Sequence, residues 1–103
     1  MTDLTALRDL LAKVEAGILP RLWPLFDAVT SSRLTRAFEG HETSAIALCK
    51  SVLPGWLWAV SSQGASIYNP GVEGDAIEFH NDGDPALALL ICTIRGLIWE
   101  AGQ

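Results

Sequence analysis

The stretch from Glu42 to Val60, ETSAIALCKSVLPGWLWAV, constrains the fold more than any other part of the chain. An apolar helical pattern begins at Glu42 and is broken by Pro54-Gly55, and a tryptophan-rich strand follows from Trp56 to Val60. Proline and glycine together end a helix and favour a turn. The stretch therefore predicts a helix that turns directly into a strand.

The predicted strand is apolar on both faces. Successive side chains of a strand point to opposite sides, so Trp56, Trp58 and Val60 share one face and Leu57 and Ala59 share the other. A strand of this kind is usually covered on both sides. We therefore expect packing partners on both faces.

The other expected elements follow from periodicity and capping signals. Apolar residues at spacings of three and four predict a first helix that begins at Thr2 or Asp3 and ends near Gly17. Residues 18–40 predict a helix from Pro24. Its expected buried side consists of Leu25, Phe26, Val29, Ala37 and Phe38.

Two further strands and a last helix complete the prediction. Strands are expected over residues 65–69 and 76–80, and Asp84-Pro85 is a strong helix start for a segment that extends to about Glu100. That helix is so apolar that the sheet and another helix, or a second subunit, must enclose it. The order predicts one α+β domain over residues 1–103: a three-stranded antiparallel meander packed with three to four helices.

Composition indicates a packed globular protein. Half of the 103 residues are hydrophobic and 18% are charged. Cys49 and Cys92 lie in apolar helical patterns, which favours buried thiols in a reducing cell interior. Asp3 and Asp9 stand where a secretory signal would have a basic start, and no apolar run reaches the roughly 20 residues of a membrane span. The expected location is the cytoplasm, without membrane contact.

The charge distribution is the most informative functional feature. Residues 1–52 hold six basic and six acidic side chains, so the net charge of −5 falls entirely in residues 53–103, where Arg95 alone opposes six acids. Five of these acids are concentrated within twelve positions: Glu73, Asp75, Glu78, Asp82 and Asp84. A surface of this sign repels nucleic acid and attracts proteins that bind nucleic acid. The alternative is ordinary solvation of a sheet edge, together with a helix cap at Asp84.

Other candidate chemistry is weaker. Residues 80–84 resemble part of a calcium loop, but Pro85 and an apolar helix replace the remaining ligands. His41, His80 and Cys49 lack the paired spacing of a zinc site or a hydrolase. We therefore expect no metal, no cofactor and no enzymatic activity.

Three aromatic residues are candidate interface residues: Trp56, Trp58 and Tyr68. They could form a platform for nucleic-acid bases, but this half of the chain has almost no cations to hold phosphates. Core packing and a protein interface are the favoured roles, because tryptophan and tyrosine are enriched at interfaces.

Three segments resemble small α/β proteins of tailed bacteriophages and prophages, of the type described as an α-β-α sandwich. They are LRDLLAKVEAG (7–17), TSAIALCKSVLPGWLWAV (43–60) and DPALALLICTIRGLI (84–98). The resemblance implies a phage context and a fold rather than a reaction, and residues 18–40 depart from the pattern.

Two functions are expected from these observations. The first is a non-catalytic phage or prophage accessory protein that binds and inhibits a nucleic-acid-binding defence complex of the host, as an anti-CRISPR protein does, by presenting its acids as a mimic of DNA. The second is a structural or assembly component of a phage particle, which forms a homodimer or larger homo-oligomer through apolar faces around Trp58 and Ile98.

Overall fold

The computed structural model describes residues 4–18, 26–71, 77–80 and 84–102, and for residues 78–80 it describes the backbone only. The elements follow in the order α1 (Leu4–Glu15), α2 (Ala28–Phe38), α3 (Glu42–Val52), β1 (Leu57–Ser61), β2 (Gly64–Tyr68), β3 (Ile77–His80) and α4 (Pro85–Ala101). The predicted α+β class is confirmed, with four helices and an antiparallel hairpin formed by β1 and β2. The third strand, β3, pairs antiparallel with β2, so β2 is central.

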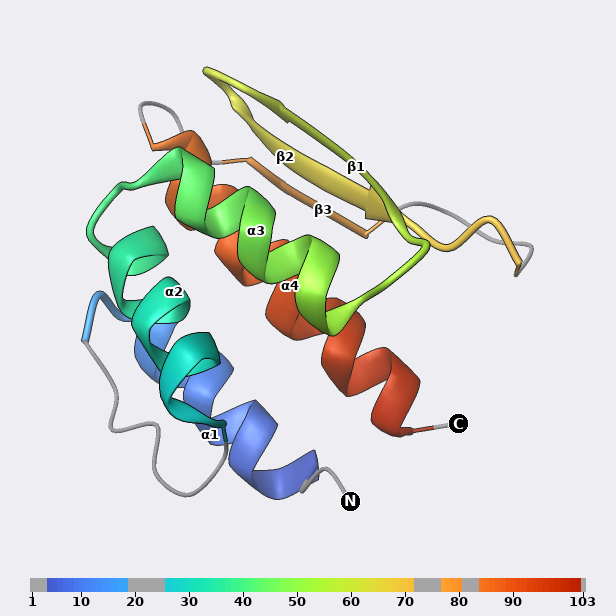
Figure 1. Cartoon of the computed structure of the whole chain (residues 1–103), viewed down its shortest axis with the longest axis horizontal. Helices are drawn as coiled ribbons and strands as arrows, with labels where there is room; N and C mark the ends of the chain where they lie inside the picture. Colours follow the sequence, from blue (N-terminus) through green and yellow to red (C-terminus); the bar gives the residue numbers. More distant parts are fainter. Residues whose placement is uncertain (1–3, 19–25, 72–76, 81–83, 103) are drawn as a thin grey trace.

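Helix α4 is the element on which all others pack. It contacts each of the other helices and strands. The sheet lies on one side of α4, while α1 and α2 lie on the other and α3 runs beside it (Figure 1). The apolar last helix is thus enclosed by the sheet and the other helices of the same chain, which is the first of the two arrangements that we expected.

The sequence of α4 explains this central position. The Leu87 backbone N–H donates a hydrogen bond to Oδ1 of Asp84 at 3.0 Å, and Pro85 occupies the first turn, as predicted. Nine of its residues are buried, almost all of them between Ala86 and Ile94. None of the described helices is long and apolar enough to cross a bilayer.

Two neighbouring polar side chains of α4, Cys92 and Thr93, are hydrogen-bonded within the core. The Cys92 thiol donates to the Ala65 carbonyl of β2 at 3.3 Å, and the fully buried Thr93 hydroxyl donates to the Leu89 carbonyl at 2.8 Å. Thr93 also hydrogen-bonds the Cys49 side chain of α3. Because its hydroxyl is hydrogen-bonded within the helix, this polar residue can lie in the core.

Helix α2 begins later than predicted. Asp27 caps it by accepting a 2.7 Å hydrogen bond from the Thr30 N–H, so the helix starts at Ala28 rather than at Pro24. This start places Thr30, Leu34 and Ala37 on the buried side and leaves Val29 61% exposed. Val29 was wrongly predicted to be buried: Phe26 lies before the helix and does not define its buried side, which follows Thr30, Leu34 and Ala37 instead. Phe26 and Phe38 are half-buried against the core, and Leu25 lies outside the described residues.

The corner after α3 forms as predicted. The helix ends at Val52, and Gly55 adopts a φ of 85°, a left-handed conformation that residues with a Cβ disfavour. Trp56 N–H then donates to the Leu53 carbonyl at 3.2 Å, and β1 begins at Leu57.

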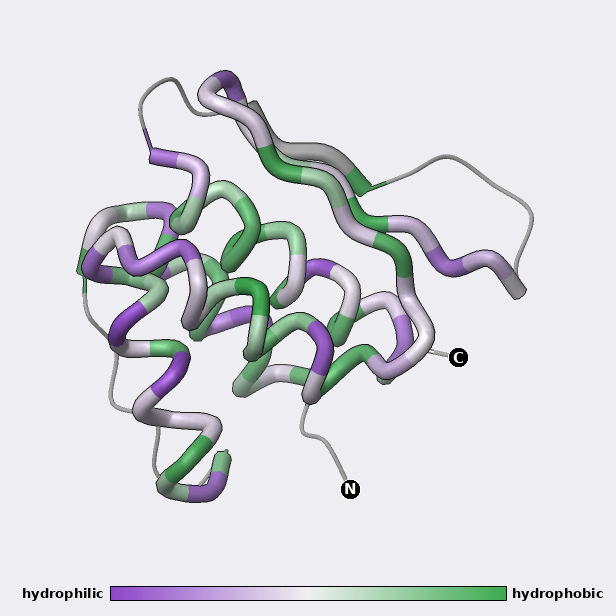
Figure 2. The backbone as a smooth tube through the Cα atoms, turned by 45° about the horizontal axis from the view of Figure 1, so that its top comes forward, coloured by the Kyte–Doolittle hydropathy of each residue, from purple (hydrophilic) through white to green (hydrophobic). Residues whose placement is uncertain are grey.

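Among the described residues, only one face of the sheet is covered. The face toward α4 carries Trp58, Ala65 and Ile67, which belong to the core or pack against it. On the other face Leu57 is 59% exposed and its cross-strand partner Tyr68 is 38% exposed. Figure 2 shows the sheet at the outside of the molecule, and all the described helices lie on the same side of the sheet. The expected cover on both faces of β1 is therefore wrong, because every described helix packs on the same side.

Candidate functional site

The predicted acidic residues belong to the chain between β2 and α4. Glu73, Asp75 and Asp82 lie outside the described residues, and Glu78 lies in β3, where it pairs in register with Ser66. Asp84 is the member whose side chain is described, and it is the N-cap of α4. Of the described acids, Glu78 therefore lies on an edge strand of the sheet and Asp84 at the start of the helix that follows it in sequence.

The capping hydrogen bond gives Asp84 a structural role besides its charge. We expect Asp84→Ala to lower the free energy of unfolding by about 1 kcal/mol, because the helix start loses a side-chain acceptor. Asp84→Asn removes the charge and keeps an acceptor of similar geometry, so we expect a loss of only a few tenths of a kcal/mol. Urea unfolding of the two variants and the wild type measures the difference. Equal losses in both variants would show that charge, and not the hydrogen bond, stabilises this end of α4.

The described cations of the N-terminal half lie on α1 to α3. Arg8 belongs to α1 and Arg33 and Arg36 to α2, and α4 separates these two helices from the sheet (Figure 1). Two ion pairs are present among the described residues: Lys13 with Asp9 at 3.0 Å within α1, and Arg95 with Glu15 at 3.2 Å between α4 and α1. In both pairs the acidic residue belongs to the N-terminal half of the chain. Arg21 lies outside the described residues.

The three predicted interface aromatics do not form one platform. Trp56 packs edge to face against Trp99 of α4, with ring centroids 5.8 Å apart, and is half-buried. Trp58 lies on the helix-facing side of β1, with the Lys50 ammonium 5.7 Å from its ring centroid. Tyr68 is exposed on the opposite face of the sheet.

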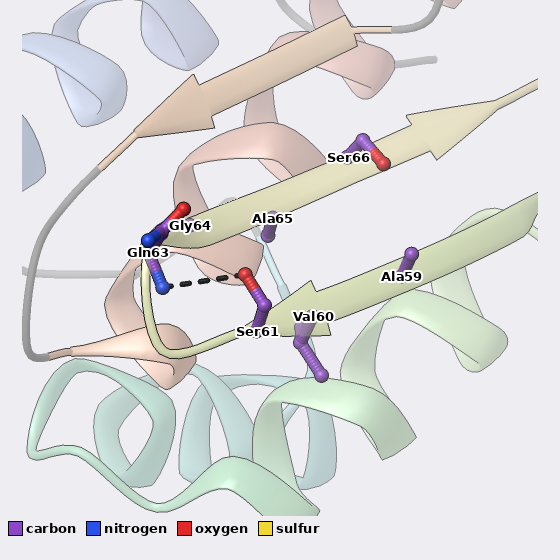
Figure 3. Close-up of a pocket in the computed structure, with 7 residues that line it drawn as sticks. All are labelled: Ala59, Val60, Ser61, Gln63, Gly64, Ala65 and Ser66. Carbon is purple, nitrogen blue, oxygen red and sulfur yellow. Dashed lines mark hydrogen bonds between the residues drawn. The ribbon is translucent and has the colours of Figure 1, made fainter.

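The open face of the hairpin is a feature that the sequence prediction missed. Ala59 and Ser66 are cross-strand partners on this face, next to the pair of Leu57 and Tyr68. Two shallow hollows of about 180 Å³ each lie along the hairpin, one of them lined by residues 59–61 and 63–66. Figure 3 shows Ala59 and Ser66 on the side away from the helices and Val60 on the other side. One sequence pattern could have revealed this face. Ser66 and Tyr68 alternate with Ala65 and Ile67, as is typical of a strand with one exposed face.

The buried thiols give little scope for nucleophilic chemistry. Cys49 and Cys92 are free and buried, as predicted. Burial raises the pKa of the Cys49 thiol because it disfavours the thiolate, although the hydrogen bond with Thr93 acts in the opposite direction. A thiol without access to solvent, and with its proton retained, is a poor nucleophile.

A histidine and a serine are in contact at the start of α3. His41 Nδ1 and Ser44 Oγ are 2.8 Å apart, but the two residues are only three positions apart and close the first turn of the helix. His80 lies in β3, and its side chain is not described. Across the described residues, no group of three His, Cys, Asp or Glu side chains is placed to hold a metal ion.

Comparison with known proteins gives no relative: no family model, no curated protein and no solved structure matches this chain.

Proposed function

We propose that this protein is a non-catalytic binding protein that docks on a basic, nucleic-acid-binding protein through the acidic stretch of residues 73–84. The observation that carries the proposal is the separation of charge. Five acids fall within positions 73–84 of the sequence, and of these the structure describes Glu78 in β3 and Asp84 at the start of α4, whereas the described arginines of the N-terminal half lie on α1 and α2, beyond α4. An uncompensated cluster of carboxylates attracts a cationic groove over several ångströms and repels nucleic acid.

The proposed partner is a host defence complex that binds nucleic acid, and a CRISPR effector is the specific candidate. The phage or prophage origin, and with it a site of action in the cytoplasm of the host bacterium, rests on the sequence resemblance alone. The mechanism needs only that the acids occupy the partner's DNA- or RNA-binding groove. No step of bond making or breaking is involved.

A pair of charge-matched variants tests this proposal. In the first, the acidic stretch is neutralised with Glu73→Gln, Asp75→Asn, Glu78→Gln, Asp82→Asn and Asp84→Asn. The second neutralises five acids of the other half with Asp3→Asn, Asp9→Asn, Glu15→Gln, Glu39→Gln and Glu42→Gln. Both variants lose the same number of charges, and Asp84→Asn retains the capping acceptor.

Tagged wild-type and variant proteins are used to capture partners from a bacterial lysate. We expect the wild type and the second variant to retain the same nucleic-acid-binding protein, and the first variant to lose at least about tenfold in affinity, since several charge contacts are removed together. Equal retention by both variants would remove the acidic stretch from the mechanism. Capture of a partner that does not bind nucleic acid would refute the mimicry.

A further inference from the structure

Strand β1 is an edge strand without the usual protection against pairing with another chain. Natural edge strands are commonly shielded by charged side chains, proline or a β-bulge. The β1 sequence, LWAVS, contains no charge and no proline, and its register with β2 is regular from Leu57 to Ser61. The surrounding segment, residues 51–72, contains no Asp, Glu, Lys, Arg or His.

The hairpin geometry determines which backbone groups β1 offers. Ser61 and Gly64 are partners on either side of a two-residue turn, so they form a hydrogen-bonded pair. Hydrogen-bonded pairs alternate along an antiparallel ladder, so Leu57 and Ala59 also bond to β2. The N–H and C=O groups of Trp58 and Val60 therefore point away from β2, along the open edge.

We propose that two copies of this protein pair antiparallel through β1, about a two-fold axis at Ala59, to form one continuous sheet. In this register Trp58 of one copy faces Val60 of the other, and each of these two symmetric pairs exchanges two hydrogen bonds. A register centred on Trp58 would pair Val60 with Trp56, whose N–H is already bonded to Leu53. A register centred on Val60 would pair Trp58 with Ser62, which lies in the turn. The axis at Ala59 satisfies all the outward groups.

The absence of charge makes this edge the place where two copies of the chain can meet with the least repulsion. Each chain carries a net charge of −5, so two copies repel each other wherever acids face acids. The β3 edge adjoins the acidic stretch, whereas β1 brings together two uncharged strands. One described cation, Lys50, lies over the Trp58 ring of its own chain. With the axis at Ala59, Trp58 of one copy lies next to Val60 of the other copy. The Trp58–Lys50 pairs of the two copies are therefore separated along the strands, so the two ammonium groups do not face each other.

The side chains also fit this register. Ala59 faces Ala59 of the second copy in a non-hydrogen-bonded pair, in which the Cα atoms approach to about 4.5 Å. Small side chains permit that approach. The exposed Leu57 would lie beside Ser61 of the second copy on the open face, where it loses contact with water.

Sedimentation of the full-length protein tests the dimer. We expect a mass of two chains at about 200 µM and dissociation on dilution towards about 1 µM, the range of a modest interface. Ala59→Glu places two carboxylates against each other at the axis and should weaken the dimer by at least about a hundredfold, because like charges directly opposite each other are destabilising. Ser66→Glu is the matched control, since Ser66 shares the open face but lies one strand away from the edge. It should change the dissociation constant by less than about threefold, and circular dichroism verifies that both variants fold.

Cross-linking tests the register. A cysteine introduced by Ala59→Cys would lie within the Cα separation that a disulfide requires, about 4.4–6.8 Å. Under mild oxidation this variant should form a covalent dimer, while Ser66→Cys should not. The native Cys49 and Cys92 are buried and do not compete.

Several outcomes would overturn the proposal. These are a wild type that stays monomeric at the highest concentration, a dimer that survives Ala59→Glu, or equal cross-linking of Ala59→Cys and Ser66→Cys. A monomer whose β1 edge is instead occupied by a strand of another protein would also overturn it. The proposal does not depend on the acidic stretch, because added salt should strengthen a dimer of like-charged chains and weaken docking on a basic partner.

Discussion

Replacing Leu89 with alanine is expected to lower the free energy of unfolding by about 2–5 kcal/mol. Leu89 is fully buried in α4, the helix that contacts every other element. Truncation removes its transfer free energy and leaves a cavity that the surrounding core can fill only in part. Urea unfolding measures this loss: the midpoint concentration of urea should fall, while the dependence of the unfolding free energy on urea concentration stays the same.

Leu57→Ala is the matched control for this variant. The same side chain is truncated, but Leu57 is 59% exposed on the open face of the sheet. At about 1 µM protein, where the proposed dimer is dissociated, we expect a change within about 0.5 kcal/mol, as for most surface substitutions. A large loss at Leu57 would show that this face is buried in solution, and a small loss at Leu89 would contradict the central position of α4.

Replacing Gly96 with valine is expected to cost about 3 kcal/mol, because the added methyl groups overpack the core. A Cβ on Gly96 would lie 2.7 Å from Cδ1 of Ile67 and 2.8 Å from Cδ1 of Leu53. Trp56 lies 3.4 Å away, so three elements of the fold meet at this glycine. The absence of a side chain is what lets α4 approach β2 and the corner after α3.

Gly96→Ala should be milder than Gly96→Val. The two closest atoms are ends of flexible side chains and can shift, and alanine gains about 1 kcal/mol in helix propensity over glycine. We expect a net loss below about 2 kcal/mol, and thermal unfolding should rank wild type, alanine and valine in that order. A valine variant as stable as the wild type would show that α4 does not pack this closely.

Sequence signals that act locally predicted most of the fold. Asp84-Pro85 correctly placed the start of α4, because capping and a preset φ depend on adjacent residues only. Pro54-Gly55 correctly placed the corner before β1 for the same reason. The periodicity of α1 identified Leu7, Leu10 and Val14, which are all buried.

The failures concern properties that tertiary packing decides. The start of α2 depends on Asp27, which competes with Pro24 as a helix start, and the side of α2 that is buried is set by packing on Thr30, Leu34 and Ala37, which leaves Val29 exposed. The open face of the sheet follows from the packing of every described helix on the opposite side, and a strand such as LWAVS is equally apolar in either case.

The candidate site was predictable only in part. The charge asymmetry is a property of the sequence, and the structure adds that Asp84 is a helix cap and that the described arginines of α1 and α2 lie beyond α4. The β1 edge could not be anticipated without the strand order, because the same strand at the centre of a sheet would offer no free backbone groups.

The salt dependence of partner binding tests the central claim most directly. The captured partner is titrated with the wild-type protein at about 50 mM and at about 500 mM salt, over which screening of exposed charges becomes much stronger. We predict that the affinity falls steeply with salt, and that neutralising residues 73–84 removes most of this dependence while the matched neutralisation of the N-terminal half does not. An affinity that is unchanged or rises with salt would contradict docking through the acidic stretch.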